Sequence, residues 1–198
     1  MSLSPDQATS VLRDIAAVEN RSQRFFAYRE ASPHLMLWGV LWAVGYGATA
    51  VMPRHGTAIW IAILAIGIAA GFLIGLRAAV QRDARADAPA DPTRRRAVAW
   101  LRWRFGGIWL IGFAFIAAAV AVMWPCSPRQ VGAFIPLVVA AAYAILGLWC
   151  GVRFVLVGAV LAMLTLGGFF LLPTQFALWM AAAGGGALVL GGSWLRQV

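Results

Sequence analysis

Six long stretches of this 198-residue chain are mostly apolar, contain no carboxylate, and carry arginine only at their ends. They cover residues 34–52, 57–76, 105–124, 130–150, 153–172 and 175–194. A helix needs about 20 apolar residues to cross a hydrocarbon core about 30 Å thick, so each stretch is long enough to span a membrane. An arginine at mid-bilayer costs about 2.5–3.5 kcal/mol on insertion scales, and the arginines avoid that position.

The composition excludes an ordinary soluble domain. Hydrophobic residues make up 62% of the chain and charged residues 12%, against about 45–50% and about 25% in soluble proteins. A soluble fold of this size has no room to bury so much apolar surface. The sequence therefore predicts an all-α polytopic membrane protein with six transmembrane helices.

The arginines predict the orientation of the bundle. All 16 basic residues are arginine. In a six-span topology, 14 of them fall on one side of the membrane. They lie in the N-terminal segment, the connector after the second span, the turn after the fourth span, and the C-terminus. The other side has only Arg54 and Arg129. Because basic loops remain in the cytoplasm, we expect both termini there, in a bacterial inner membrane.

The end of the connector interleaves arginine with tryptophan and continues directly into the third span. Arginine beside aromatic residues also suits nucleic acids, but no RNA- or DNA-binding motif accompanies this patch. Arginine can extend its charge to the membrane surface, and tryptophan favours the interface. We therefore expect contacts with anionic lipid headgroups, and no nucleic acid, from Arg94, Arg95, Arg96, Trp100, Arg102, Trp103 and Arg104.

A repeated pattern groups the spans in pairs. The first, third and fifth spans end at proline, and the second, fourth and sixth end in glycine and arginine. We interpret these pairs as three parallel hairpins, although any helical hairpin tends to have proline outside and arginine inside. The expected divisions are a cytoplasmic amphipathic helix (1–33), hairpin 1 (34–77), a basic connector (78–104), hairpin 2 (105–152) and hairpin 3 (153–198).

This pattern of glycine-rich hairpins with proline at the turn, over about residues 104–196, resembles the small six-helix bacterial inner-membrane proteins of the acid-resistance (HdeD-like) type. The resemblance implies six membrane helices built from short hydrophobic hairpins. The N-terminal segment and the arginine-rich connector depart from that pattern, and no functional residue is carried over.

Small residues recur within the spans, often four apart, and such residues let helix backbones approach closely. We expect close helix packing at Gly39, Ala43, Gly47, Gly71, Gly75, Gly147, Gly151, Gly184, Gly185 and Gly186. The last three residues interrupt the sixth span. Two interpretations of that interruption remain open: a thin contact face, or a broken helix that binds a substrate.

The first 33 residues predict an amphipathic helix that ends near Pro33. Ser4 to Gln7 fits a capping box with proline in the first turn. Four arginines balance four carboxylates here, so anionic lipid attracts this segment little. We therefore expect it to pack on the bundle, on a second copy or on a partner protein, with a position on the lipid surface as the alternative. The apolar stripe comprises Ala8, Val11, Ile15, Val18 and Phe25.

Residues that support membrane-enzyme chemistry are sparse. His34 and His55 are the two histidines, and they stand at opposite ends of the first span. They cannot hold one metal ion together, and we expect no metal, no cofactor and no catalytic site. Cys126 and Cys150 lie at opposite ends of the fourth span, about 36 Å apart along a helix, so they cannot form a disulfide.

Three polar residues within the spans are candidates for a small pocket or pore: Tyr46, Tyr143 and Thr165. Hydrogen bonding between helices is the other interpretation of these residues. The chain as a whole predicts a non-enzymatic scaffold, sensor or regulatory subunit that acts through cytoplasmic contacts. The alternative is a small channel or the solute-binding subunit of a membrane transporter, which a polar cavity at mid-membrane would favour.

Overall fold

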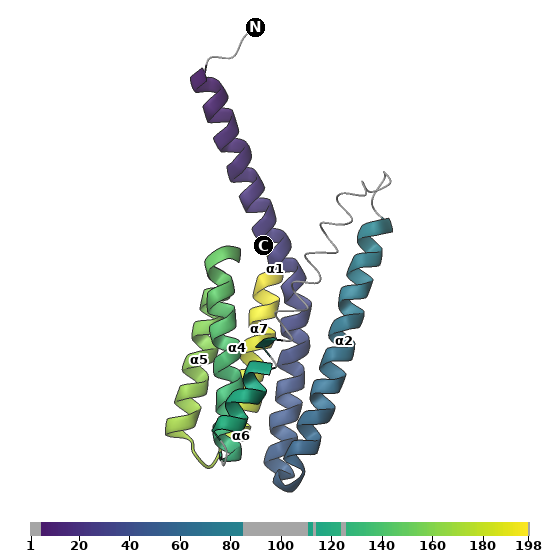
Figure 1. Cartoon of the computed structure of the whole chain (residues 1–198), viewed down its shortest axis with the longest axis vertical. Helices are drawn as coiled ribbons and strands as arrows, with labels where there is room; N and C mark the ends of the chain where they lie inside the picture. The colour runs from purple at the N-terminus through teal and green to yellow at the C-terminus, as the bar shows by residue number, and fades with distance from the viewer. Residues whose placement is uncertain (1–4, 85–110, 113, 124–125, 198) are drawn as a thin grey trace.

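The computed structural model describes residues 5–84, 111–112, 114–123 and 126–197, and its regular elements are all helices (Figure 1). Within these described residues, five helical segments are long and apolar enough to cross a membrane. The prediction of an all-helical chain with several membrane-length apolar helices is therefore confirmed. Most of the expected third span, 105–124, lies outside the described residues, and residues 114–122 are helical. The five candidate spans are Ala27–Val51, Pro53–Ala78, Pro128–Cys150, Val152–Leu171 and Phe176–Arg196.

Helix α1 runs without a break over Pro5–Val51, a length of 47 residues that includes Pro33. The prediction that the N-terminal helix ends near Pro33 is wrong. Proline removes one N–H and one hydrogen bond from a helix, but here buried residues on both sides of Pro33 keep the helix in place. Tyr28 and Leu35 belong to the core, and buried Ser32 hydrogen-bonds to another helix.

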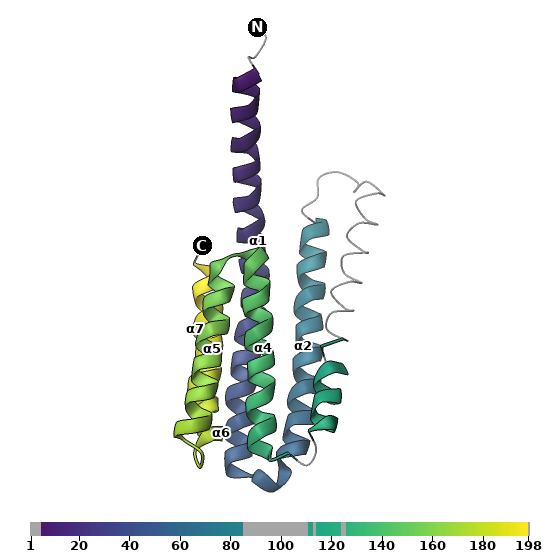
Figure 2. The same ribbon diagram turned by 60° about the vertical axis from the view of Figure 1, so that its left-hand side comes forward.

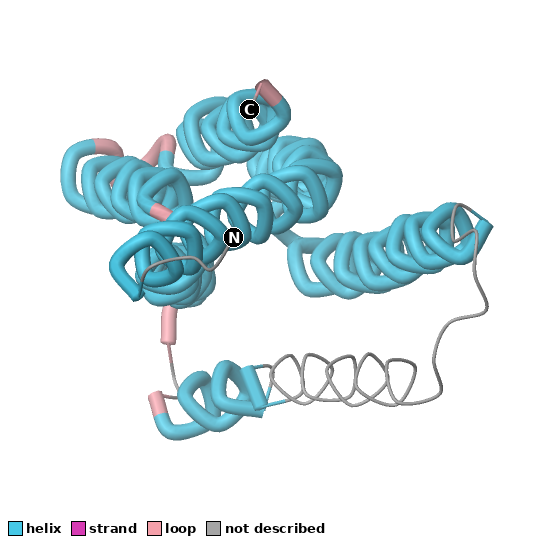
Figure 3. The backbone as a smooth tube through the Cα atoms, turned by 90° about the horizontal axis from the view of Figure 1, so that it is seen from above, coloured by secondary structure: helices cyan, strands magenta, loops and turns pink. Residues whose placement is uncertain are grey.

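A 3₁₀ turn, η1 (Pro53–His55), joins α1 to α2 (Gly56–Ala84). Helix α2 packs along α1 but otherwise stands to one side of the bundle (Figures 2 and 3). At Gly67 an added Cβ would lie 2.6 Å from the Trp38 ring, so any larger residue would force that ring to shift. Only 11% of the α2 span is buried, which leaves most of its apolar surface facing outward.

Helix α4 (Pro128–Cys150) begins with a capping box, in which Ser127 and Gln130 satisfy each other's backbone N–H groups. It ends at Gly151, whose φ of 121° is open to glycine and strained for other residues. Helix α5 (Val152–Leu171) follows directly and returns beside α4.

The last span consists of a short helix, a π-helical turn and a longer helix in one continuous rod. These elements are α6 (Phe176–Trp179), η2 (Met180–Gly184) and α7 (Gly185–Arg196). The glycines at 184–186 therefore do not break the helix. Single π-helical turns are uncommon and often occur at functional sites.

Two closely packed antiparallel pairs, α1 with α7 and α4 with α5, form the bundle. Along the first pair, Ser32 Oγ donates a 2.7 Å hydrogen bond to the carbonyl oxygen of Gly192, and Gly39 meets Gly185 seven residues further on. The beginning of the α1 span and the end of α7 thus lie at the same end of the bundle (Figure 1). The core takes aromatic and aliphatic residues from α1, α4, α5 and the last span.

Candidate functional site

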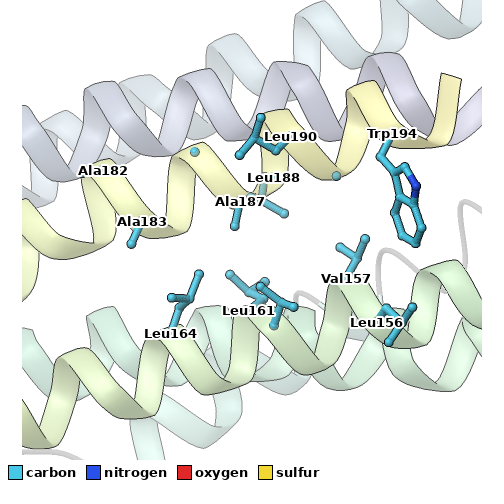
Figure 4. A pocket seen from close by; sticks show the side chains of 13 residues that line it. Leu156, Val157, Leu161, Leu164, Ala182, Ala183, Ala187, Leu188, Leu190 and Trp194 are labelled. Atoms are coloured by element: carbon cyan, nitrogen blue, oxygen red, sulfur yellow. The ribbon is translucent and has the colours of Figure 1, made fainter. Parts of the chain in front are cut away.

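An apolar groove separates α5 from the last span and has a volume of about 520 Å³ (Figure 4). Pockets of this size are typical of sites for small molecules. Every lining residue is aliphatic, glycine or tryptophan. The wall on α5 consists of Leu156, Val157, Val160, Leu161 and Leu164. Figure 4 shows the side chains of Leu156, Val157, Leu161 and Leu164 pointing toward the last span.

The groove exists because the opposite wall is made mainly of small residues. Ala182 and Ala183 come from the π-helical turn, and Gly186, Ala187 and Gly191 come from α7. An added Cβ at Gly186 would meet no described heavy atom within 4 Å. Small residues on this face cannot reach α5, so the two helices leave a space between them.

A tryptophan hydrogen-bonds to Leu164, the residue at one end of the groove. Trp179 Nε1 donates a 2.8 Å hydrogen bond to the carbonyl oxygen of Leu164, which joins the last span to α5. Gly168 makes this possible, since a Cβ there would collide with the Trp179 indole.

Arg153 stands at the other end of the groove, next to Trp194. Its guanidinium carbon lies 4.7 Å from the Trp194 ring centroid and 5.8 Å from that of Tyr28, both within cation–π range. One of its N–H groups donates a 3.1 Å hydrogen bond to the Trp194 carbonyl oxygen in the last turn of α7. The rim therefore combines a cation with aromatic rings, as residues at a membrane interface do.

A second feature is the N-terminal part of α1, which continues beyond the bundle (Figures 1 and 2). The helix has 47 residues and its candidate span is the last 25, which leaves 22 residues, Pro5–Phe26. At 1.5 Å per residue this projecting segment is about 33 Å long.

The base of the projecting segment is fixed to the bundle. The Tyr28 ring lies 5.2 Å from Phe154 of α5, and Ser32 bonds to α7. Phe154, Leu35 and Ser32 are almost completely buried. The helix that carries the projecting segment is therefore packed directly against α5 and α7.

The three polar residues expected in a pocket do not line the groove. Tyr46 donates a 2.6 Å hydrogen bond to the Gly132 carbonyl oxygen, which links α1 to α4. Tyr143 stacks on Phe154 with 6.2 Å between ring centroids. Thr165 is fully buried and bonds to the Leu161 carbonyl oxygen of its own helix. Tyr46 thus follows the alternative interpretation, a hydrogen bond between helices.

The glycines and the alanine expected to pack closely fall into two groups. Gly39, Ala43 and Gly185 meet at the contact between α1 and α7, and Gly147 meets Val155 between α4 and α5. The others make no such contact with described residues of another helix. Gly47, Gly75 and Gly186 face open space, a Cβ at Gly71 would lie 3.8 Å from His34, Gly184 touches Met180 of its own helix, and Gly151 forms the turn.

The arginine and tryptophan residues expected at lipid headgroups all lie outside the described residues. They are Arg94, Arg95, Arg96, Trp100, Arg102, Trp103 and Arg104. Their expected contact with anionic lipid stays a prediction.

The described residues contain no group of three His, Cys, Asp or Glu side chains close enough to hold a metal ion. Cys126 and Cys150 are both free thiols. This agrees with their positions at opposite ends of one span, which are too far apart for a disulfide between them.

Sequence reasoning missed the groove and its rim. From the sequence, Arg153 serves only as a topological charge and as the arginine that ends a hairpin, and neither Trp179 nor Trp194 is singled out. The sequence contained one signal for the groove, since residues 181–187 are all glycine or alanine. Side chains this small cannot fill the space toward neighbouring helices on both sides of the last span.

No protein-family model, curated protein or solved structure matches this chain. The resemblance of residues 104–196 to HdeD-like proteins therefore stays a prediction, and the function has to be argued from the site.

Proposed function

We propose that this chain is a non-enzymatic multi-pass membrane protein that acts as a scaffold, sensor or regulatory subunit through the projecting segment of α1, Pro5–Phe26. The observation that carries this proposal is the continuity of α1 through Pro33. A continuous helix holds its outer residues at a fixed distance from the membrane, whereas a flexible linker does not.

The partner of the projecting segment is a protein helix, either on a second copy or on another protein. The segment runs away from the bundle (Figure 1), so the bundle itself is not the surface it covers. Its balanced charge gains little from anionic lipid. The spacing of Val11, Ile15 and Val18 in the sequence is that of an apolar stripe suited to another helix.

The same proposal includes the number of spans, their pairing into hairpins and their orientation in the membrane. Residues 105–124 form the remaining span of six, the spans form three parallel hairpins, and both termini lie in the cytoplasm of a bacterium. Support comes from the arginines: Arg29, Arg77, Arg153 and Arg196 lie toward one end of the bundle, and basic loops remain inside.

The described bundle gives less support to a channel or solute-binding subunit. Tyr46, Tyr143 and Thr165 are packed among other side chains, and the groove is lined by apolar residues. Solute or ion flux into proteoliposomes, unaffected by changes in the projecting segment, would favour that second class.

The proposal is tested by two matched substitutions in the projecting segment. Ile15→Glu places a charge on the apolar stripe, and Ala17→Glu places the same charge away from it. Burial of one isoleucine contributes about 1.5–3 kcal/mol, so Ile15→Glu should weaken association about 10- to 100-fold while Ala17→Glu has little effect.

Association is measured in two ways. The mass of the purified protein in detergent detects a second copy. In native membranes, a photo-crosslinking amino acid at Val11 should trap a partner, and the same group at Ala17 should not. Equal behaviour of both variants in both measurements would refute a protein-binding role for this segment.

A further inference from the structure

The groove between α5 and the last span has the length of one membrane leaflet. Its lining residues run from Leu156 to Leu164 on α5 and from Ala182 to Trp194 on the last span, and Arg153 stands just beyond the end that Trp194 marks. At 1.5 Å per residue these stretches are about 12 Å and about 18 Å long, and half of a hydrocarbon core, about 15 Å, lies between the two values. A groove that stops near mid-bilayer suits a lipid chain better than a transmembrane helix, which would cross the whole core.

The wall of the groove has the chemistry of an acyl-chain site. It consists of aliphatic residues, glycine and tryptophan, and its floor is formed by the buried residues Val157, Leu161 and Leu188. Leu156 and Val160 on its edge are more than two-fifths exposed. In a bilayer such an opening faces hydrocarbon, and empty space would lose the dispersion contacts that a chain provides.

The rim supplies the partner for a headgroup. Arg153 is the cation next to Trp194, and a guanidinium has five N–H donors, of which the bond to the Trp194 carbonyl uses one. Arginine binds phosphate well through paired donors. No aspartate or glutamate follows Asp91, so the side chains of the groove-forming helices offer this cation no negative partner.

We propose that this groove binds one anionic phospholipid, with an acyl chain between α5 and α7 and the phosphate at Arg153. This inference does not depend on the projecting segment of α1. It assigns a lipid site distinct from the expected headgroup contacts at 94–104.

The test uses native mass spectrometry of the full chain with phosphatidylglycerol and phosphatidylcholine of identical acyl chains. The wild type should retain one lipid and prefer phosphatidylglycerol about fivefold, the factor that one basic residue near an anionic lipid supplies. Arg153→Gln should bind both lipids equally. Arg129→Gln is the matched control, because Arg129 also stacks on an aromatic ring, Phe169, at 4.5 Å, but at the far end of the bundle.

Two further variants test the acyl chain. Gly186→Phe fills the groove and should reduce retention of both lipids at least fivefold, and Ala187→Leu should do the same more mildly. Gly167→Phe is the control, since an added Cβ at Gly167 also meets no described atom and this residue does not line the groove. Melting temperatures of all variants separate loss of lipid from loss of fold.

Three results would overturn the proposal. Equal lipid retention by Gly186→Phe and Gly167→Phe would show that no chain occupies the groove. An unchanged preference for phosphatidylglycerol in Arg153→Gln would remove the headgroup contact. Loss of a dimer in Gly186→Phe, with no change in bound lipid, would assign the groove to a second copy.

Discussion

The contact between α1 and α7 predicts opposite effects for one substitution at two positions of α1. At Gly39 an added Cβ would lie 2.8 Å from the Gly185 carbonyl oxygen and 2.7 Å from Val189 Cγ2. Ordinary contacts of a Cβ begin near 3.4 Å. The oxygen belongs to a helix backbone and cannot rotate away, so Gly39→Ala must push the two helices apart. At Gly47 the same methyl group would meet no described atom within 4 Å.

The magnitudes decide the sign of each effect. Overpacking costs about 1–3 kcal/mol, and replacing glycine by alanine in a helix recovers about 0.5–1 kcal/mol. Because a backbone oxygen cannot move aside, the cost at Gly39 belongs to the middle or upper part of the overpacking range, and Gly39→Ala should lose about 1–2 kcal/mol of unfolding free energy. Gly47→Ala should gain up to about 1 kcal/mol. For a chain of this size each kcal/mol shifts the melting temperature by about 2–4 °C.

The assay is thermal unfolding in detergent, followed by the fluorescence of the ten tryptophans. Gly39→Ala should melt about 2–8 °C below the wild type and Gly47→Ala at or above it. The double variant Gly39→Ala/Gly185→Ala should lose less than the sum of its parts, because one separation of the helices accommodates both methyl groups. Equal melting temperatures for Gly39→Ala and Gly47→Ala would refute the close contact.

Three further predictions concern hydrogen bonding and topology. Tyr46→Phe removes the 2.6 Å bond to Gly132 and should lower stability by about 0.6–1.7 kcal/mol, measured by the same thermal unfolding. An impermeant thiol reagent applied from outside should label Cys126 and not Cys150, and an intramolecular disulfide on oxidation would contradict the position of α4. A reporter that works only in the cytoplasm should be active when fused to the C-terminus, and one that works only in the periplasm should be inactive there. Activity of the periplasmic reporter would contradict the proposed orientation.

The sequence predicts the spans well because membrane insertion depends on a property that can be read locally, the length of apolar helix. Prolines show the limit of local reasoning. Pro136 lies inside α4 and did not prevent the prediction of a span there, whereas Pro33 was expected to end a helix. Both prolines lie within helices, because packing against neighbouring helices holds the backbone on either side of them. The neighbours of Pro33 are known only once α5 and α7 are placed.

Glycine spacing has a similar limit. Gly39 and Gly47 both lie on the predicted stripe of α1, yet only Gly39 meets another helix among the described residues. A spacing of four predicts that a helix can be approached closely, but it contains no information on which helix approaches. That choice follows from the register between α1 and α7, where Ser32 meets Gly192 and Gly39 meets Gly185.

The candidate pocket residues show why polarity was a poor guide to the site in this chain. Tyr46, Tyr143 and Thr165 were selected as polar groups within apolar spans, and the structure places all three in packed surroundings. Inside a hydrocarbon layer a polar side chain has no water to bond, so it is drawn toward carbonyl groups and neighbouring rings. Space is left instead where side chains are small and apolar, since lipid can fill it at no cost in hydrogen bonds. The groove beside Gly186 and Ala187 is such a space, and the charge that makes it a candidate binding site stands at its rim, in Arg153.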